Sequence, residues 1–345
     1  MQLYCATKVL CSSFRMDFSP NNDIRVMTSA KVKVFLGDPG EWDRWLDDFG
    51  GASAYQYQPF IGLHDRRVQV MSGPQVLGGG VVVSAPVLGW PQRILTLHRG
   101  PVGDLLSLLG PLEAWARDQG AWCLELMPDT QMDSDRAAVM SSRNWQLASG
   151  ARHTLRLELR HDESTLLGNL ESRARYQIKR GERDGIVVRS AQNNDDVASF
   201  CRLYAEMIAE KNLHGGSESH LSNLGRYLIA NPNRGTILLA EYEGSAIGTN
   251  LLWRSASRVE NLYGASRKQK IAVGYPLQWA SIMWAKAGGA AEYDFGGYDP
   301  NLNGGPALMK RAFCNNIVPL SPRWRKVFNP ILFNTAFWLR RRLIR

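Results

Sequence analysis

Short apolar runs separated by proline and glycine dominate the first half of the chain. They lie at residues 68–71, 76–83 and 93–98, and runs of this length rich in Val, Ile and Leu predict strands. The next segment, 104–119, has the spacing of a helix and ends before Gly120. Its apolar positions are Leu105, Leu108, Leu109, Leu112 and Trp115. A strand at 122–127, a second helix and a strand at 154–159 complete this half.

The same order of elements returns in the second half. A charged segment at 163–184 predicts a helix that Gly185 ends, and a strand at 186–189 and further helix up to about Ala230 follow. Strand-like segments then lie at 236–242, 246–253 and 259–263, before a helix at 275–287 and a strand at 292–295. Each half therefore predicts a three-strand antiparallel meander, a helix and a strand.

An ungapped internal match links the two helix–strand units. The pattern Trp-Ala-Arg, Gly-Ala and Glu-Leu that begins at Trp115 aligns with Trp-Ala-Lys, Gly-Ala and Asp-Phe beginning at Trp284. One unit could match by chance, but the preceding meander in each half favours duplication. Meander, helix and strand is also the order of the acetyltransferase fold. The predicted fold class is α/β, with two tandem GNAT (acetyltransferase-like) domains and no coiled-coil arm.

Length and composition agree with two folded domains. The 345 residues exceed what one hydrophobic core usually supports, and 44% hydrophobic with 21% charged residues is typical of a folded chain. We expect the boundary between Leu159 and Asp162. The predicted parts are a disordered or untranslated extension at 1–30, domains at 31–160 and 161–322, and a basic amphipathic C-terminal helix at 323–345.

Charge and targeting signals limit the partners and the location. A net charge of +9 favours an anionic partner, either nucleic acid, a phosphorylated metabolite or an acidic membrane surface. The five cysteines are scattered without a CxxC pair, which argues against a disulfide framework and a zinc site. No signal-peptide pattern or apolar run of about 20 residues appears. We therefore expect a cytoplasmic protein, with 323–345 either on the inner face of the plasma membrane or docked on its own domain.

Four segments carry a resemblance to a known family. They are Arg-Gly-Pro-Val-Gly-Asp at 99–104, Arg-Ala-Arg-Tyr-Gln-Ile-Lys-Arg at 173–180, Tyr-Gly-Ala-Ser at 263–266 and Tyr-Asp-Phe-Gly-Gly at 293–297. Together they resemble the FemAB and FemX aminoacyltransferases that build peptidoglycan bridges, and the likeness covers roughly 53–313. Glycines at 185, 215 and 216 interrupt the helical stretch 163–230, which has no sustained heptads. The chain is therefore most similar to the armless FemX-type members.

The resemblance implies an activity and its reactants. The donor would be an aminoacyl-tRNA, the acceptor a peptidoglycan precursor such as lipid II or UDP-MurNAc-pentapeptide, and no cofactor or metal would be required. Transfer from an ester to an amine needs a neutral amine, donors for the oxyanion and both reactants held in register, but no protein nucleophile. That agrees with the absence of GxSxG and HExxH motifs. The expected oligomeric state is a monomer.

Two residues are predicted to be catalytic. Lys310 lies in Met-Lys-Arg-Ala-Phe at 309–313, which resembles the Phe-Lys-rich motif whose lysine is at the family's reaction centre, although Met309 replaces the usual aromatic residue and Cys314 the usual glycine. An ammonium there would stabilise the oxyanion or the departing ribose oxygen. In the family the aspartate that matches Asp104 is near the acceptor. The alternatives are a surface lysine and a helix-capping aspartate.

The remaining site predictions concern substrate binding. Basic residues on neighbouring turns of the helix near 173–180 could neutralise a diphosphate or a tRNA backbone, or could form a solvated face. The glycines after the strand at 292–295 would let a ligand approach the backbone, or would only make a tight turn. The predicted substrate-binding residues are Arg99, Arg175, Tyr176, Lys211, Tyr263, Arg267, Tyr293, Asp294, Gly296, Gly297 and Tyr298.

Two other functions fit parts of the pattern. An acyl-CoA-dependent N-acyltransferase of the same fold would hold pyrophosphate with R-x-x-G-x-A at a helix start. Residues 267–272 read Arg-Lys-Gln-Lys-Ile-Ala and lack that glycine, although their basic side chains could still bind phosphates. A nucleic-acid-binding adaptor without catalytic activity agrees with the charge but leaves the Tyr-Asp-Phe-Gly-Gly segment unexplained.

Overall fold

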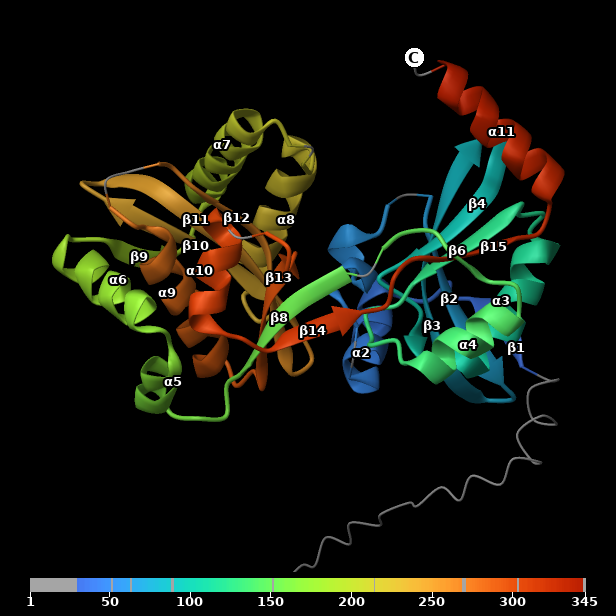
Figure 1. Cartoon of the computed structure of the whole chain (residues 1–345), viewed down its shortest axis with the longest axis horizontal. Coiled ribbons are helices and arrows are strands. Elements are labelled where there is room, and N and C mark those ends of the chain that lie inside the picture. The colour runs from blue at the N-terminus through green and yellow to red at the C-terminus, as the bar shows by residue number, and fades with distance from the viewer. Residues whose placement is uncertain are drawn as a thin grey trace, which may run out of the picture.

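The computed structural model contains two mixed β-sheets, each flanked by helices (Figure 1). It describes residues 30–50, 52–62, 64–87, 90–150, 152–213, 215–268, 271–302 and 304–343. Apart from Ala30, the predicted N-terminal extension lies outside these residues. None of the helices in this described part is long and apolar enough to span a membrane.

The first sheet has the strand order β1-β2-β3-β4-β6-β15-β7, with β5 paired to β3. Strands β2, β3 and β4 form the predicted antiparallel meander, and helix α3 then leads to β6, which lies parallel to β4. The elements of this half are β1 (Lys31–Val34), α2 (Pro39–Phe49), β2 (Arg66–Ser72), β3 (Gln75–Val87), β4 (Trp90–His98), β5 (Val102–Gly103), α3 (Leu105–Asp118), β6 (Cys123–Met127), α4 (Ser134–Ser142) and β7 (Gln146–Leu147).

The second sheet repeats this arrangement in the order β14-β8-β13-β12-β11-β10-β9. Its meander is β10-β11-β12, and helix α9 leads to β13, which lies parallel to β12. The remaining elements are β8 (Arg152–Glu158), α5 (Glu163–Asn169), α6 (Ser172–Arg183), β9 (Val187–Ser190), α7 (Asn194–Lys211), α8 (Glu218–Ala230), β10 (Gly235–Tyr242), β11 (Ser245–Ser255), β12 (Arg258–Ser266), α9 (Gly274–Ala287), β13 (Glu292–Tyr298), α10 (Gly305–Phe313), β14 (Ile317–Leu320), β15 (Trp324–Val327) and α11 (Pro330–Leu343).

The internal match in the sequence is also a match in geometry. Gly120 after α3 and Gly289 after α9 have φ angles of 69° and 80°, a left-handed conformation that favours glycine. In each copy the next alanine donates its backbone N–H to the carbonyl of the helical alanine five residues earlier, at 3.0 Å and 3.1 Å. The predicted α/β class with tandem acetyltransferase-like halves is confirmed. In the described part of the chain no helix exceeds the 18 residues of α7, so that part contains no coiled-coil arm.

The halves exchange a strand, and this corrects the predicted boundaries. β8 was expected to close the first half, but it pairs with β13 and β14 in the second sheet, where Leu155 and Leu159 are buried in the core. The equivalent place beside β6 is filled by β15, at the far end of the chain. The chain therefore passes between the sheets near residues 148–152 rather than 159–162, and β8 and β14 run through the middle of the molecule (Figure 1).

Two predicted helices also differ from the structure. The segment 323–345 begins as strand β15 because Trp324, 3% exposed, belongs to the core of the first half, and only α11 is helical. The segment 163–184 forms two helices, α5 and α6. Between them the buried Leu170 has an extended backbone, with φ of −68° and ψ of 154°.

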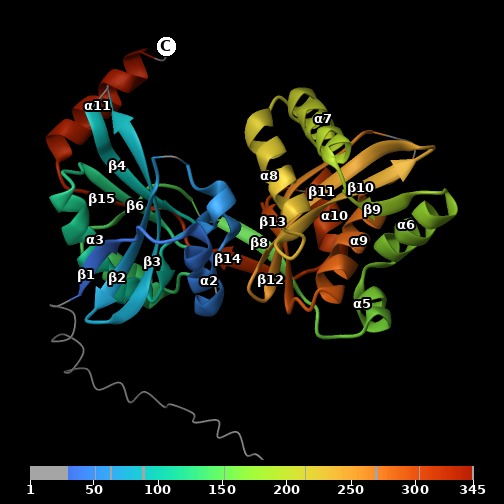
Figure 2. The same ribbon diagram turned by 180° about the vertical axis from the view of Figure 1, so that it is seen from behind.

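A hydrophobic core is shared between the two halves. It joins Trp42 of α2 and Tyr57 to Phe200 of α7 and Trp253 of β11, and all four side chains are less than 2% exposed. Helix α2 lies on the side of the first half that faces the second, in both views (Figure 1, Figure 2). Because packed interiors tolerate little rearrangement, this core fixes the position of one half relative to the other.

Candidate functional site

Two cavities meet where strands β12 and β13 separate. The strands pair in parallel only as far as Glu260 and Asp294, whereas on its other edge β13 pairs with β8 up to Tyr298. One cavity, of about 380 Å³, lies between the halves and is called the inter-half cavity; the other, of about 530 Å³, lies among β12, α9 and α10 and is called the α9–α10 cavity. Both are lined by Asn261, Leu262, Gly296 and Gly297, which we call the junction.

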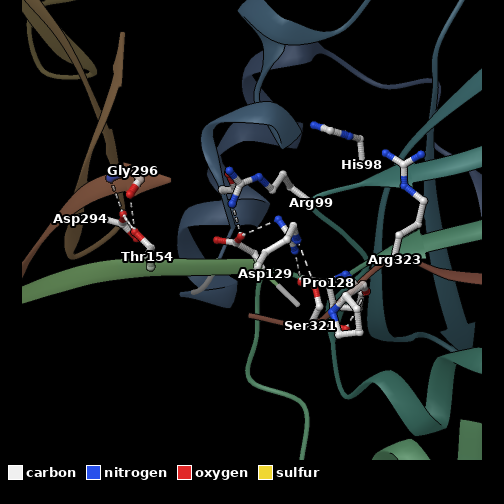
Figure 3. Close-up of polar contacts among 12 residues, drawn as sticks. His98, Arg99, Pro128, Asp129, Thr154, Asp294, Gly296, Ser321 and Arg323 are labelled. Atoms are coloured by element: carbon white, nitrogen blue, oxygen red, sulfur yellow. Dashed lines mark hydrogen bonds and ion pairs between the residues drawn. The ribbon is translucent and has the colours of Figure 1, made fainter. Parts of the chain in front are cut away.

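The turn at Gly296 gives the junction its shape. Gly296 has a φ of 72°, and a Cβ atom there would lie 2.6 Å from the carbonyl oxygen of Asn261, so only glycine fits. Its N–H donates to Oδ1 of Asp294 at 2.8 Å, and the hydroxyl of Thr154 donates to the same carboxylate (Figure 3). Arg156 Nε donates to the other carboxylate oxygen at 3.0 Å. The buried carboxylate of Asp294 therefore holds the turn.

A β-bulge at Leu262 lies on the opposite wall of the junction. Along β11, Leu252 faces Asn261 and Leu251 faces Tyr263, so Leu262 has no residue opposite it in the ladder. Bulges of this kind are frequent beside active sites because they turn a backbone group away from the sheet. The backbone amide of Leu262 is therefore a candidate donor to a ligand carbonyl.

Lys310 lies on α10 in the wall of the α9–α10 cavity. Its Nζ donates to the carbonyl oxygen of Gly297 at 2.8 Å, which places the ammonium beside the junction. Burial lowers the pKa of Lys310 to about 8, against the opposing effect of the Asp294 carboxylate. Sequence reasoning did not predict that 305–313 is helical, although Pro306 at the start of α10 is a typical helix-opening residue.

A cluster of arginines around one carboxylate lies between the halves. Asp129, with a side chain 4% exposed, lies 2.5 Å from Arg99 (Figure 3). It also lies 3.4 Å from Arg258, 3.8 Å from Arg156 and 4.0 Å from Arg152. Burial alone would raise the pKa of Asp129, but the arginines hold it below its ordinary value. Arg99 reaches this cluster from a left-handed backbone with φ of 58°.

Glu260 is a second buried carboxylate in the wall of the inter-half cavity. It accepts hydrogen bonds from the backbone N–H of Ala54 at 3.0 Å and from the hydroxyl of Ser53 at 3.2 Å, both in the first half. Burial raises the pKa of Glu260, and Arg258 opposes this shift. Sequence reasoning missed Glu260 and the partners of Arg99. The sequence feature that could have indicated the partners of Arg99 is Asp129, an acidic residue just after a buried strand.

The structure brings several predicted site residues together. Those in the walls of the inter-half cavity are Arg99, Asp294, Gly296, Gly297 and Tyr298. Those in the walls of the α9–α10 cavity are Lys211, Arg267, Gly296, Gly297 and Lys310. The site prediction is therefore consistent with the geometry for eight of its residues.

Asp104 and Arg175 lie outside the two cavities and make local hydrogen bonds. Asp104 is exposed and accepts from the backbone N–H of Ser107 at 3.1 Å, so it caps helix α3. Arg175 donates to the carbonyl oxygens of Gly168, at 3.0 Å, and Leu170, and thereby satisfies the C-terminal end of α5. Neither residue lines a described cavity. Local hydrogen bonding explains why each is present.

Three predicted tyrosines also lie outside the two cavities. Tyr176 is 54% exposed on α6. Tyr263 packs edge-on against Tyr204 of α7 at 5.4 Å between ring centres. Tyr293 is fully buried and accepts a hydrogen bond from Gln278 at 2.6 Å. Neighbouring residues of a strand point to opposite faces of the sheet. Since Asp294 faces the cavity, Tyr293 points into the core.

Comparison with known proteins places the fold among acetyltransferase-like (GNAT) domains. A model of the acetyltransferase (GNAT) domain matches residues 169–303, which include the junction. The crystal structure of FemX superposes with a TM-score of 0.75, at 16% identity, over 88% of this chain and 99% of that chain. The chain has the tandem GNAT fold. The chain is also 25% identical, over 60% of its length and 67% of the relative, to the UDP-N-acetylmuramoylpentapeptide-lysine N(6)-alanyltransferase of Weissella viridescens. The resemblance to FemX-type proteins is thereby confirmed.

Other tandem proteins share the fold more distantly. The structure of L-PGS from Bacillus licheniformis superposes with a TM-score of 0.56, at 13% identity, over 88% of this chain and 96% of that chain. A tandem GNAT protein from the clavulanic acid biosynthesis pathway superposes with a TM-score of 0.54, at 12% identity, over 86% of this chain and 98% of that chain. At these identities the likeness extends to the fold alone.

Proposed function

We propose that the protein is an aminoacyltransferase that moves an amino acid from aminoacyl-tRNA to the stem peptide of a peptidoglycan precursor. The observation that carries this proposal is the junction, where two separate cavities open on one glycine turn beside a lysine ammonium. Two reactants, one in each cavity, can meet at one point, as an ester-to-amine transfer requires. The similarity to an alanyltransferase acting on a muramoylpentapeptide supports the same reaction.

In this proposal the acceptor amine enters through the inter-half cavity and the aminoacyl ester through the α9–α10 cavity. The neutral amine attacks the ester carbonyl, the new C–N bond forms, and the C–O bond to the ribose breaks. The proton lost by the amine balances the charge on the departing ribose oxygen. We assign the stabilisation of the oxyanion to the ammonium of Lys310 and the amide of Leu262, since preorganised donors stabilise an oxyanion most effectively in a site shielded from water.

The direct test is a product analysis. Purified protein is incubated with charged tRNA, acetyl-CoA and a nucleotide-linked pentapeptide, and the products are weighed by mass spectrometry. We expect the pentapeptide to gain one aminoacyl group only when charged tRNA is present. A gain of one acetyl group would instead establish the acyl-CoA alternative.

Charge pairing in the loop before α9 favours tRNA over CoA as the donor. Arg267 makes two hydrogen bonds of 2.8 Å to Glu206, and Lys268 forms an ion pair with Glu210. These carboxylates of α7 offset the basic side chains that a CoA pyrophosphate would use and would repel the pyrophosphate itself. An aminoacyl ester brings no such group to this part of the cavity.

Binding of charged tRNA should depend steeply on salt concentration. Each phosphate contact by an exposed arginine adds about 0.7 to 0.9 to the slope of log affinity against log salt. We expect Arg173→Gln, at the exposed mouth of the α9–α10 cavity, to reduce that slope by about one. The matched variant Arg226→Gln, on the exposed side of α8, should leave the slope unchanged. Tight calorimetric binding of acetyl-CoA without binding of charged tRNA would contradict the donor assignment.

We further propose that the enzyme is a cytoplasmic monomer that contacts an anionic membrane through α11. This helix buries Phe333 and Ala336 on the first half, with Arg325 over the Phe333 ring at 5.1 Å, but leaves Ile331 79% and Leu332 38% exposed. Docking and membrane contact are therefore compatible, because one side of α11 packs on the first half and the opposite side is left for the membrane. Basic residues at 340–342 continue the same segment.

A substitution on the exposed side of α11 tests the membrane contact. Ile331→Asp should weaken binding to phosphatidylglycerol vesicles about tenfold, because it replaces an apolar side chain that would enter the membrane with a negatively charged one. The melting temperature should stay unchanged, since the side chain is exposed. The control Leu36→Asp, at a residue 89% exposed near β1, should bind vesicles like the parent. Equal vesicle binding by parent and Ile331→Asp would refute the contact.

A further inference from the structure

Arg152 is an arginine in the inter-half cavity that two backbone carbonyls hold and whose carboxylate partner, Asp129, is 4.0 Å away and shared. Its Nε donates to the carbonyl of Ser321 at 3.0 Å and its Nη2 to the carbonyl of Pro128 at 2.8 Å. The remaining nitrogen, Nη1, lies 4.0 Å from Asp129. Two backbone carbonyls thus orient the guanidinium, and one edge remains for an anionic ligand.

The carboxylates around Arg152 all pair with other arginines: Asp294 with Arg156, Glu260 with Arg258 and Glu125 with Arg323. Asp129 already accepts the short contact from Arg99, and it is shared with arginines at positions 156 and 258. Arg323 and His98 lie on the same side of Asp129 as Pro128 and Ser321 (Figure 3). Burial first, and then the charges of Arg99 and Arg323, lower the pKa of Arg152 to about 10 against the opposing effect of Asp129. A partly buried charge whose counter-charge is shared and 4.0 Å away is only partly compensated, and a bound anion would relieve the remaining cost.

The size of the cavity limits the anion. At about 380 Å³ the inter-half cavity is near the lower end of ligand sites, and it suits the end of a side chain better than a sugar nucleotide. On β8, Arg152 is two residues from Thr154, which faces Gly297 of the junction. Two residues of strand span about 7 Å. An anion at Arg152 is therefore only a few bonds from an amine at the junction.

We propose that Arg152, supported by Arg99, binds a carboxylate that lies beside the reacting amine of the acceptor. The preferred acceptor side chain would end in an amino acid centre, with amine and carboxylate on one carbon, rather than in a plain alkyl amine. This rests on the proposed transfer to a stem peptide. It would distinguish the protein from the Weissella relative, which is by name a lysine N(6)-alanyltransferase.

The test uses two acceptors that differ by one carboxylate. They are nucleotide-linked pentapeptides, one with lysine and one with 2,6-diaminoheptanedioate at the acceptor position. We expect kcat/KM of the parent to be at least about tenfold higher for the dicarboxylate acceptor, as for a charge-assisted pair. Arg152→Gln should lose that preference while transferring to the lysine peptide within about twofold of the parent. Arg160→Gln, an exposed arginine just after β8, should keep it.

Further arms separate the ways in which the inference could fail. Equal kcat/KM for both acceptors in the parent would overturn it. Arg152→Gln could instead slow transfer to both nucleotide-linked acceptors but not to phosphate-free peptides. That result would assign the arginine to the phosphates of the carrier and would also overturn the inference. Absence of transfer to either acceptor would refute the proposed function instead, and calorimetric binding of the two phosphate-free peptides would then decide the carboxylate preference. If Arg152→Gln does not fold, Arg152→Lys tests the same preference with the charge retained.

Discussion

Lys310→Ala is expected to lower the rate of transfer at least about a hundredfold while the fold and the binding of both reactants persist. A fixed cationic donor at a developing oxyanion contributes roughly 3 kcal/mol to the transition state, and alanine removes it. The loss should appear in kcat, measured with saturating acceptor and charged tRNA, rather than in affinity. Turnover within about threefold of the parent would refute the assignment.

The matched control for this variant is Arg311→Ala. Arg311 is the next residue of α10, is exposed, and lines neither described cavity, so transfer should stay within about twofold of the parent. Lys326 is unsuitable as a control. Its Nζ donates to the carbonyl of Arg143 and lies 3.1 Å from Glu113, so its removal would change stability.

The pH dependence distinguishes two roles for Lys310, whose pKa is about 8. The fraction of neutral acceptor amine, with a pKa of about 10, rises tenfold per pH unit. If the ammonium of Lys310 is required, log kcat/KM should rise with a slope of one below pH 8 and level off above it. If the neutral lysine acted as a base instead, log kcat/KM should rise with a slope of two below pH 8 and a slope of one above it. Lys310→Arg should extend the rise above pH 8, since arginine stays charged.

Asp129→Asn is expected to reduce the free energy of unfolding by about 3 to 5 kcal/mol, measured by urea denaturation. The substitution leaves the four arginines around position 129 without their shared counter-charge in a buried site. Asp48→Asn, at an exposed position of α2, should change the free energy by less than about 0.5 kcal/mol. A stability equal to that of the parent would show that the cluster contributes no net stabilisation.

The same variant has a predictable dependence on pH. The pKa of Asp129 is held below its ordinary value of 3.8 in the folded protein. Its contribution to stability is therefore fully present above pH 3.8 and is lost as pH falls through the lower, folded-state pKa. The difference between parent and Asp129→Asn should thus shrink only in strong acid. A difference that shrank already between pH 7 and 5 would contradict the ionised state assigned to Asp129.

Local patterns predicted the local structure well. Alternation and helical spacing placed both meanders and the helices α3 and α9, because these elements are decided by nearby residues. The resemblance to known motifs placed Lys310 and the glycine turn. Strand alternation would also have allowed only one of Tyr293 and Asp294 to face a cavity, so that part of the site prediction was avoidable.

Long-range pairing could not be predicted in the same way. β8 and β15 have ordinary strand patterns, and nothing in those patterns tells which sheet each one joins. The cluster around Asp129 combines residues 99, 129, 152, 156 and 258, which share no motif and meet only after both halves have packed. Asp104 and Arg175 lie outside both cavities, where each makes a capping hydrogen bond that the local sequence alone could have suggested.

The place of β15 has a consequence for synthesis of the protein. Trp324–Val327 pairs with both β6 and β7, so the first sheet lacks an interior strand until residue 327 has left the ribosome. Domains of most chains fold in order as they emerge. Here the half that is made first must wait with an open edge for the end of the other half, and a chaperone that covers β6 during that interval would protect it from pairing with a neighbouring chain.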